Sequence, residues 1–414
     1  FYIFILLISI FFSGFFLFGL LRFNKNLKIN LSLIVFSIGF SIYSIELYLE
    51  FSKPKPIELI AKEMGVEYDT RSYLQVLNDL NDSGIEAFPN IHPRTLHDFK
   101  NTYGKIHVLG SISNTTVIFN NESGYFPIIQ TDEHGFNNSK GLYKPDLVDI
   151  VLIGDSFAEG ISVKSDESIS AVLRNFDYKT ISLGKINNGP LSEFATLIEY
   201  AKPIRPRIVL WMYFVNDLSD LRMEIPSSLL TKYIDDDKYS QNLINRQDEI
   251  DNLLKNYIKV KLENKDNKES KNVKLLNTFK NYSINIIKLS KLRRIINLTP
   301  KSTPSPLFKK ILDKANQTVN QWNGKMYFIY LPHDRYKTGK AHENRDFVIK
   351  TVNDLGIPII DVHKEVFDMH KDPLSLFPFR FRNGGHYNKE GYRLVANAIK
   401  KRLEDDNYNA LNSK

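Results

Sequence analysis

The stretch Val148-Asp149-Ile150-Val151-Leu152-Ile153-Gly154-Asp155-Ser156 decides the fold of this chain. Its first six residues are apolar apart from one Asp and predict a buried parallel strand. The Gly-Asp-Ser that follows turns the chain away from the carboxyl end of that strand. In α/β proteins the chemistry lies at this edge of the sheet. Ser156 is therefore the first candidate for a functional residue.

Further apolar runs of strand length follow in the same pattern. They lie at residues 178–183, 207–213, 325–331 and 357–361. Longer segments with helical patterning separate them, which indicates parallel strands joined by crossover helices. We therefore expect an α/β three-layer sandwich with a five-stranded parallel sheet. A closing helix at about 389–403 is expected to begin after Asn388, a suitable N-cap.

The residues before this body divide into an anchor and a prelude. We expect a two-helix transmembrane anchor at 1–50, a linker and small mixed accessory prelude at 51–147, and the catalytic body at 148–405 with a helical insertion at about 220–320. Extended stretches at 117–119 and 126–129 are expected in the prelude. The sequons that begin at Asn114 and Asn121 are discounted, because Asn is abundant throughout the chain.

Two apolar segments, 1–21 and 29–49, approach the ~20 residues that a helix needs to cross a bilayer. Arg22, Lys25 and Lys28 lie in the link between them. The positive-inside rule places this link in the cytoplasm and the rest of the chain on the extracytoplasmic or periplasmic side. A signal peptide is the alternative interpretation of the first segment.

The positive charge of the chain is concentrated in one region. Residues 251–300 hold twelve Lys or Arg and four Asp or Glu, a net +8 that equals the net charge of the whole chain. Apolar residues recur at helical spacing within this region: Leu275, Leu276, Phe279, Ile286, Ile287, Leu289, Leu292, Ile295 and Ile296. The region could contact anionic lipid headgroups or an acidic glycan, or be an insertion with a solvated Lys-rich face. Nucleic acid is disfavoured as a partner by the expected compartment.

The chain contains no cysteine. This excludes disulfides, zinc-thiolate sites and thiol nucleophiles, so covalent catalysis would have to use Ser, Thr, Lys or a carboxylate. No cluster of His, Asp and Glu has a spacing typical of metal ligands. We interpret His333, His363 and His370 as structural or exposed.

Polar residues that suit acyl transfer follow three of the predicted strands. Ser156 follows the first, Asn187 and Gly189 follow the second, and Asn216 follows the third. His386 precedes the closing helix and could fold over the same edge. Here His386 would be the base, and the Ser156 N–H, the Asn187 N–H and the Asn216 amide would be donors to an oxyanion.

Together, Gly154-Asp155-Ser156, the loop 184–189, Asn216-Asp217 and His386 before a helix resemble the ordered blocks of the SGNH, or GDSL-type, hydrolase superfamily. The resemblance covers roughly residues 148–405, and residues 131–137 resemble a segment that often precedes the first block in membrane-anchored members. It implies a Ser156 nucleophile, a His386 base and a flavodoxin-like sandwich that needs no cofactor. The implied substrates are acyl esters, including O-acetylated glycans, and some relatives transfer the acyl group.

The chain departs from the family pattern at two positions. The family's acid lies three residues before the histidine, where this chain has Asn383, which cannot supply a negative charge. Catalysis would then use Asn383 as an orienter, run on a Ser-His dyad, or recruit another carboxylate such as Asp372. The second departure is Asn187, where the family usually has an oxyanion-hole glycine; Asn tolerates the left-handed backbone that the position requires.

Plainer interpretations accompany each candidate. Ser156 could be a helix N-cap, Asn216 could close a turn, His386 could be an ordinary loop histidine, and Asp155 and Asp217 could accept loop N–H groups.

Three functions follow from the sequence. The first is a membrane-anchored serine esterase or O-acyltransferase acting on an acylated extracytoplasmic glycan or lipid-linked polymer. The second is a catalytically impaired relative that binds glycan or scaffolds envelope machinery. The third is a membrane-interaction protein that works through residues 251–300.

Overall fold

Five parallel strands form the central sheet: β4 (Ile150–Ile153), β5 (Thr180–Ser182), β6 (Ile208–Tyr213), β7 (Lys325–Tyr330) and β8 (Ile359–Asp361). Their order is β5-β4-β6-β7-β8, and every neighbouring pair is parallel. All five strands predicted from the sequence are confirmed, together with their direction. The order has the second strand outside the first, as in flavodoxin-like sheets.

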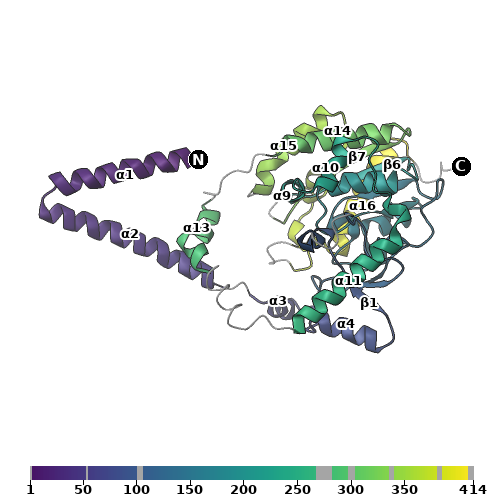
Figure 1. The fold of residues 1–414 in the computed structure, drawn as a ribbon, viewed down its shortest axis with the longest axis horizontal. Helices are drawn as coiled ribbons and strands as arrows, with labels where there is room; N and C mark the ends of the chain where they lie inside the picture. The colour runs from purple at the N-terminus through teal and green to yellow at the C-terminus, as the bar shows by residue number, and fades with distance from the viewer. Residues whose placement is uncertain are drawn as a thin grey trace. The chain divides into compact units, whose positions relative to one another are not determined.

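The computed structural model describes residues 2–52, 55–99, 106–266, 282–296, 304–334, 340–379 and 385–408. The chain divides into two compact units. One consists of Phe1–Lys55 with Asn264–Thr303, and the other of Pro56–Glu263 with Pro304–Lys414. The labelled elements of both are drawn in Figure 1.

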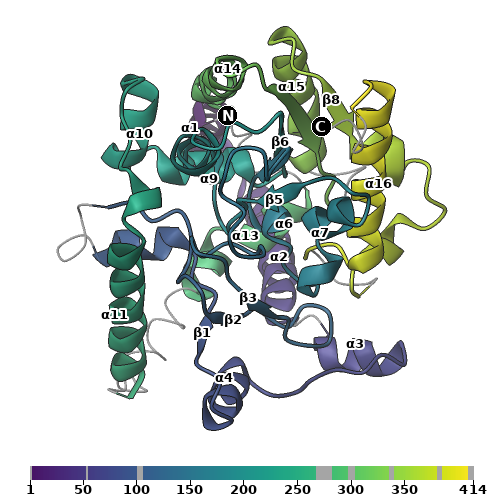
Figure 2. The same cartoon turned by 90° about the vertical axis from the view of Figure 1, so that its right-hand side faces the viewer.

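Helices cover both faces of the sheet. Ile150 and Leu152 of β4 belong to one buried apolar cluster, whereas Val151 and Ile153 belong to another. The first cluster includes α7 (Ile169–Arg174) and α16 (Lys389–Asp405), which pack together at one side in Figure 2. The second includes α8 (Pro190–Thr196), α14 (Pro306–Asn320) and α15 (Lys340–Asp354). Because alternate residues of a strand face opposite ways, this arrangement is a three-layer α/β sandwich.

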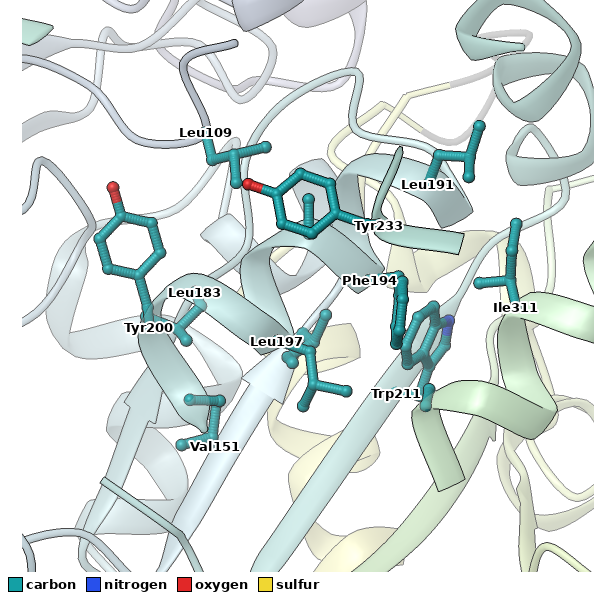
Figure 3. Close-up of a cluster of buried hydrophobic side chains, with 14 of the residues drawn as sticks. Leu109, Val151, Leu183, Leu191, Phe194, Leu197, Tyr200, Trp211, Tyr233 and Ile311 are labelled. Carbon is teal, nitrogen blue, oxygen red and sulfur yellow. The ribbon is translucent and has the colours of Figure 1, made fainter. Parts of the chain in front are cut away.

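The segment that precedes the large sheet, residues 56–147, is called the prelude below. Its elements are α3 (Ile57–Glu63), α4 (Tyr73–Asp82), β1 (Ala87–Pro89), η1 (Pro93–Phe99), β2 (Thr116–Ile118) and β3 (Ile128–Gln130). The strands form a small sheet in the order β1-β2-β3, with β1 and β2 parallel and β2 and β3 antiparallel. Leu109 of the prelude is buried in the same cluster as Val151 and Trp211, as Figure 3 shows. The prelude therefore shares the hydrophobic core of the large sheet.

Further helices follow β6: α9 (Asp217–Glu224), α10 (Ser228–Asp235) and α11 (Gln247–Asp266). Short 3₁₀ turns occur at η2 (Ser165–Glu167), η4 (Leu243–Asn245) and η6 (Pro373–Leu376), and π-helical turns at η3 (Leu197–Ala201) and η5 (His363–Phe367). The closing helix α16 begins where the sequence predicts, because Asn388 Oδ1 accepts the N–H groups of Glu390 and Gly391.

The smaller unit contains α1 (Tyr2–Arg22), α2 (Lys25–Phe51) and α13 (Ser290–Ile295). In the described residues, α2 is the one helix long and apolar enough to cross a membrane; in α1 the apolar stretch is the shorter Ile10–Gly19. The sequence-based expectation of two spanning helices is thus supported for one only. A signal sequence near an N-terminus would also pass this test of length and composition.

Part of the basic region packs on α2. The buried Glu46 carboxylate accepts the backbone N–H groups of Lys291 and Leu292 at 2.8 and 2.7 Å. Ile287 and Ile295 remain 70% and 61% exposed. The expected apolar positions Leu275, Leu276 and Phe279 lie outside the described residues.

Candidate active site

Ser156 lies directly beyond the carboxyl end of β4. It is the first residue of α6 (Ser156–Glu159), and the N-cap of this turn is Asp155, whose side chain accepts the Phe157 N–H at 3.0 Å. Asp155, and not Ser156, is therefore the N-cap of this turn. The Ser156 side chain is left to make other contacts and is nearly buried, at 6% exposure.

His386 contacts this serine from the loop before α16. His386 Nε2 lies 2.6 Å from Ser156 Oγ, and the imidazole packs on the Phe157 ring with centroids 4.8 Å apart. The distance is that of a hydrogen bond in which the hydroxyl donates to a neutral ring nitrogen. This is the geometry that a serine nucleophile and its general base require.

The opposite ring nitrogen of His386 is bound by a carboxylate that the sequence did not suggest. His386 Nδ1 lies 2.8 Å from Glu122 Oε2, and the same oxygen accepts the His386 backbone N–H at 3.2 Å and the Ser162 hydroxyl at 2.8 Å. Glu122 lies in the prelude, in the loop between β2 and β3. The residue expected to orient the histidine, Asn383, lies outside the described residues. Asp372, the other carboxylate considered, lies at the N-cap of η6.

Glu122 also sets the electrostatics of the base. Burial disfavours the charged imidazolium, but the adjoining carboxylate and its hydrogen bond outweigh this effect and raise the pKa of His386. With Nδ1–H donating to Glu122, Nε2 is the acceptor that faces Ser156. Ser156, His386 and Glu122 therefore have the contacts of a charged nucleophile-base-acid triad.

The backbone N–H groups of Ser156 and Asn187, at this edge of the sheet, have no acceptor among the residues that the structure describes. The loop of Asn187 is tied to the serine turn by a hydrogen bond from the Lys185 N–H to the Gly154 carbonyl at 3.2 Å. Asn187 has φ +62°, the left-handed conformation that was expected where relatives have glycine. Unengaged N–H groups at this edge are suitable donors to an oxyanion.

Asn216 follows β6 at the same edge, as expected, and is the N-cap residue of α9. Its Nδ2 donates to Asp220 Oδ2 at 2.7 Å. It also acts on Asp155: burial raises the pKa of Asp155 to about 6, while hydrogen bonds from the Phe157 N–H and Asn216 oppose the rise. At least one of the two N–H groups of the Asn216 amide is therefore engaged by a carboxylate.

Gly189 allows two helices to approach behind this loop. Its N–H donates to Glu224 Oε1 at 2.8 Å. A Cβ at this position would lie 2.7 Å from Glu224 Oε2 and 2.9 Å from the backbone carbon of Asp220. Gly189 thus provides space for this approach and donates its N–H to Glu224.

Several buried carboxyl groups lie close together behind the serine turn. Burial, with the nearby carboxylates, raises the pKa values of Glu193 and Asp217 well above their ordinary range. Burial raises the pKa of Glu224 to about 7, although backbone donors oppose it. Asp217 also accepts the Phe214 N–H at 3.1 Å, the structural role expected for it. In the described parts of the chain, no group of three or more His, Asp or Glu is placed to hold a metal ion.

Comparison with known proteins finds distant structural matches. No family model matches the chain, and no curated protein matches it. Solved structures do match: a lipolytic protein of the G-D-S-L family from Desulfitobacterium hafniense shares 12% identity with a TM-score of 0.35, covering 61% of this chain and 97% of that one. An acetyl xylan esterase shares 13% identity with a TM-score of 0.35, covering 61% and 98%.

A lipase/acylhydrolase from Enterococcus faecalis shares 11% identity with a TM-score of 0.36, covering 63% of this chain and 96% of that one. Such values do not assign a function to this chain. The function has to follow from the residues at the sheet edge.

Proposed function

We propose that the chain is a serine ester hydrolase or O-acyltransferase that works through a Ser156 acyl-enzyme. The observation that carries this proposal is the unbroken contact from Ser156 Oγ through His386 to the Glu122 carboxylate. A serine hydroxyl is a weak nucleophile unless a positioned base takes its proton, and the base needs a partner that stabilises its charged form.

In the proposed reaction, Ser156 Oγ attacks the carbonyl carbon of an acyl ester while its proton passes to His386 Nε2. Glu122 stabilises the imidazolium, and the N–H groups of Ser156 and Asn187 stabilise the oxyanion. The imidazolium then returns its proton to the leaving alcohol oxygen as the ester bond breaks. Water or an acceptor hydroxyl resolves the acyl-enzyme by the same steps in reverse, and His386 again acts as the base.

An acylated glycan or lipid-linked polymer outside the cytoplasm is the substrate class that we propose. The support is the apolar helix α2, which is long enough for a membrane anchor. The positive charges of Arg22, just before α2, and of Lys25 and Lys28, near its start, favour an extracytoplasmic catalytic unit. Contact of residues 251–300 with an anionic surface is part of the same proposal. Its support is that Ile287 and Ile295 are exposed, near Lys288 and Lys291, in the segment that packs on α2.

The catalytically impaired alternative rested on Asn383, which cannot supply a negative charge to the histidine. Glu122 supplies that carboxylate at 2.8 Å, so the geometry favours an active enzyme.

Labelling of the full chain in detergent with a fluorophosphonate probe tests the proposal. We expect the wild type to be labelled and Ser156→Ala and His386→Ala to be unlabelled. His370→Ala, in which a histidine beside η6 is removed, is the matched control and should label normally. An unlabelled wild type that is correctly folded would contradict an activated serine.

The choice between hydrolysis and transfer requires an acceptor. Release of acetate from p-nitrophenyl acetate should be measured with and without added oligosaccharide. Transfer predicts an acetylated oligosaccharide in the mass spectrum, whereas a hydrolase gives acetate alone under both conditions.

A further inference from the structure

Arg94 of the prelude connects two parts of the active-site edge that are far apart in the sequence. Its Nη2 donates to the Asn187 carbonyl at 2.6 Å and to Asp220 Oδ1 at 2.9 Å, and its Nη1 donates to the same carboxylate oxygen at 3.0 Å. The other oxygen, Asp220 Oδ2, accepts the Asn216 amide. One guanidinium therefore holds the Asn187 peptide and the carboxylate that binds Asn216.

The Asn187 loop is held on its other side as well. The Ile186 N–H donates to Glu159 Oε2 at 2.7 Å. Glu159 Oε1 pairs with the buried Lys185 ammonium at 2.8 Å and accepts Asn90 Nδ2 at 3.1 Å. The Asn187 N–H thus lies between two peptide groups that are both fixed by charged side chains, and prelude residues contribute on both sides.

We propose that Arg94 is a positioning residue for the oxyanion hole of this enzyme. By holding the Asn187 carbonyl, it keeps the left-handed Asn187 backbone in the conformation in which the Asn187 N–H faces the reacting acyl group. By holding Asp220, it sets where the Asn216 amide lies. This inference rests on the proposed acyl-transfer function and extends it to a residue that touches neither Ser156 nor His386.

The chemistry of the contact requires arginine. The guanidinium is planar and presents donors in fixed directions, so it can bind a carboxylate and a carbonyl at the same time. A lysine ammonium in the same place would keep the charge but not the fixed geometry. Both partners are largely enclosed, since the side chains of Arg94 and Asp220 are 17% and 10% exposed. Water therefore competes weakly for these bonds.

A purely structural ion pair is the competing explanation, and the two differ in what they predict. Loss of a structural pair lowers stability and reduces activity only through unfolding. Loss of a positioning residue lowers kcat in enzyme that remains folded. It also leaves the pH profile unchanged, because the contacts of His386 with Glu122 are untouched.

The test uses full-length protein in detergent with p-nitrophenyl acetate as substrate, and compares Arg94→Lys and Arg94→Met with the wild type. Removal of one oxyanion donor costs about 10²- to 10³-fold in kcat, so a misplaced donor is expected to cost about 10- to 100-fold. We expect a fall in that range for Arg94→Met and a smaller one for Arg94→Lys, with KM changed less than kcat. Arg71→Met is the control, since Arg71 is a prelude arginine paired with Asp69 and Asp79.

Arg94→Met leaves the Asp220 carboxylate without its cation and could lower the yield of folded protein. The double variant Arg94→Met/Asp220→Asn removes that charge and is the second measurement. We expect it to fold with the thermal midpoint of the wild type and with the low kcat of the single variant, because the Asn187 carbonyl is still unheld.

Wild-type kcat in folded Arg94→Lys, or recovery of kcat in the double variant, would overturn the role of Arg94. Fluorophosphonate labelling of the wild type separates this result from failure of the proposed function. Labelled wild type with fully active Arg94 variants rejects the positioning role alone, whereas absence of labelling in folded wild type rejects the enzyme.

Discussion

Replacement of Glu122 by glutamine isolates the charge at His386 from the hydrogen bonds that surround it. Glu122 Oε2 accepts three donors: the His386 Nδ1–H, the His386 backbone N–H and the Ser162 hydroxyl. The amide oxygen of Glu122→Gln can take the same place and accept the His386 Nδ1–H, which keeps the histidine tautomer. What the variant loses is the negative charge.

The size of the effect follows from the distance. At 2.8 Å between Glu122 Oε2 and His386 Nδ1, an effective dielectric constant of about 20 gives an attraction of about 6 kcal/mol. The side chains are 15% and 16% exposed, and water reduces the value; a dielectric constant twice as large gives about 3 kcal/mol. Since about 1.4 kcal/mol is a tenfold change in rate, kcat should fall about 10²- to 10⁴-fold.

The assay is hydrolysis of p-nitrophenyl acetate by full-length protein, followed under single-turnover conditions so that acylation of Ser156 is observed directly. Glu86→Gln, which neutralises an exposed carboxylate of the same prelude, is the matched control and should match the wild type. Wild-type acylation in folded Glu122→Gln, with Ser156→Ala inactive, would show that the charge of Glu122 is not used.

Three further outcomes are expected. The kcat/KM of the wild type should fall as the pH drops through the raised pKa of His386, because the base must be neutral; in Glu122→Gln this limb should move to lower pH, since the largest contribution that raises the pKa of His386 is lost. Asn187→Gly should keep the wild-type kcat, whereas Asn187→Val should destabilise the loop by about 1–2 kcal/mol at its φ of +62° and lower kcat, as urea unfolding and turnover will report. Glu46→Ala should expose the segment that contains Leu292 to trypsin, because two backbone N–H groups lose their acceptor. Glu46→Gln should expose it less. Equal cleavage of the wild type and both variants would reject this contact.

Much of the fold could be predicted because its signals are local. The five strands are apolar runs of strand length, and Asn388 precedes its helix in the position of an N-cap. The meeting of Ser156 with His386 was predicted because Ser156 ends a strand and His386, placed by the resemblance before the closing helix, could fold over the same edge. The left-handed Asn187 was expected because the resemblance puts a glycine at this position, and Asn is one of the few other residues that tolerate that backbone.

Glu122 and Arg94 could not be predicted in the same way. Both lie in irregular or short elements of the prelude, and their partners are more than 90 residues away along the chain. No periodicity or spacing in the sequence connects Glu122 or Arg94 with so distant a partner, because neither Glu122 nor Arg94 lies at the end of a strand of the main sheet. In the sequence, Glu122 stands out only as the middle residue of the sequon that begins at Asn121. The domain boundaries within residues 51–147 remain a prediction.

The position of Glu122 changes how related chains should be judged. A sequence comparison that looks for the acid three residues before the histidine would reject this chain as inactive, although a carboxylate lies 2.8 Å from His386 Nδ1. The residues of the motif alone do not establish whether the site is complete, because a carboxylate from another loop can stand beside the histidine. Chains that lack the motif's Asp therefore merit a search of the loop corresponding to β2–β3 before they are described as non-catalytic.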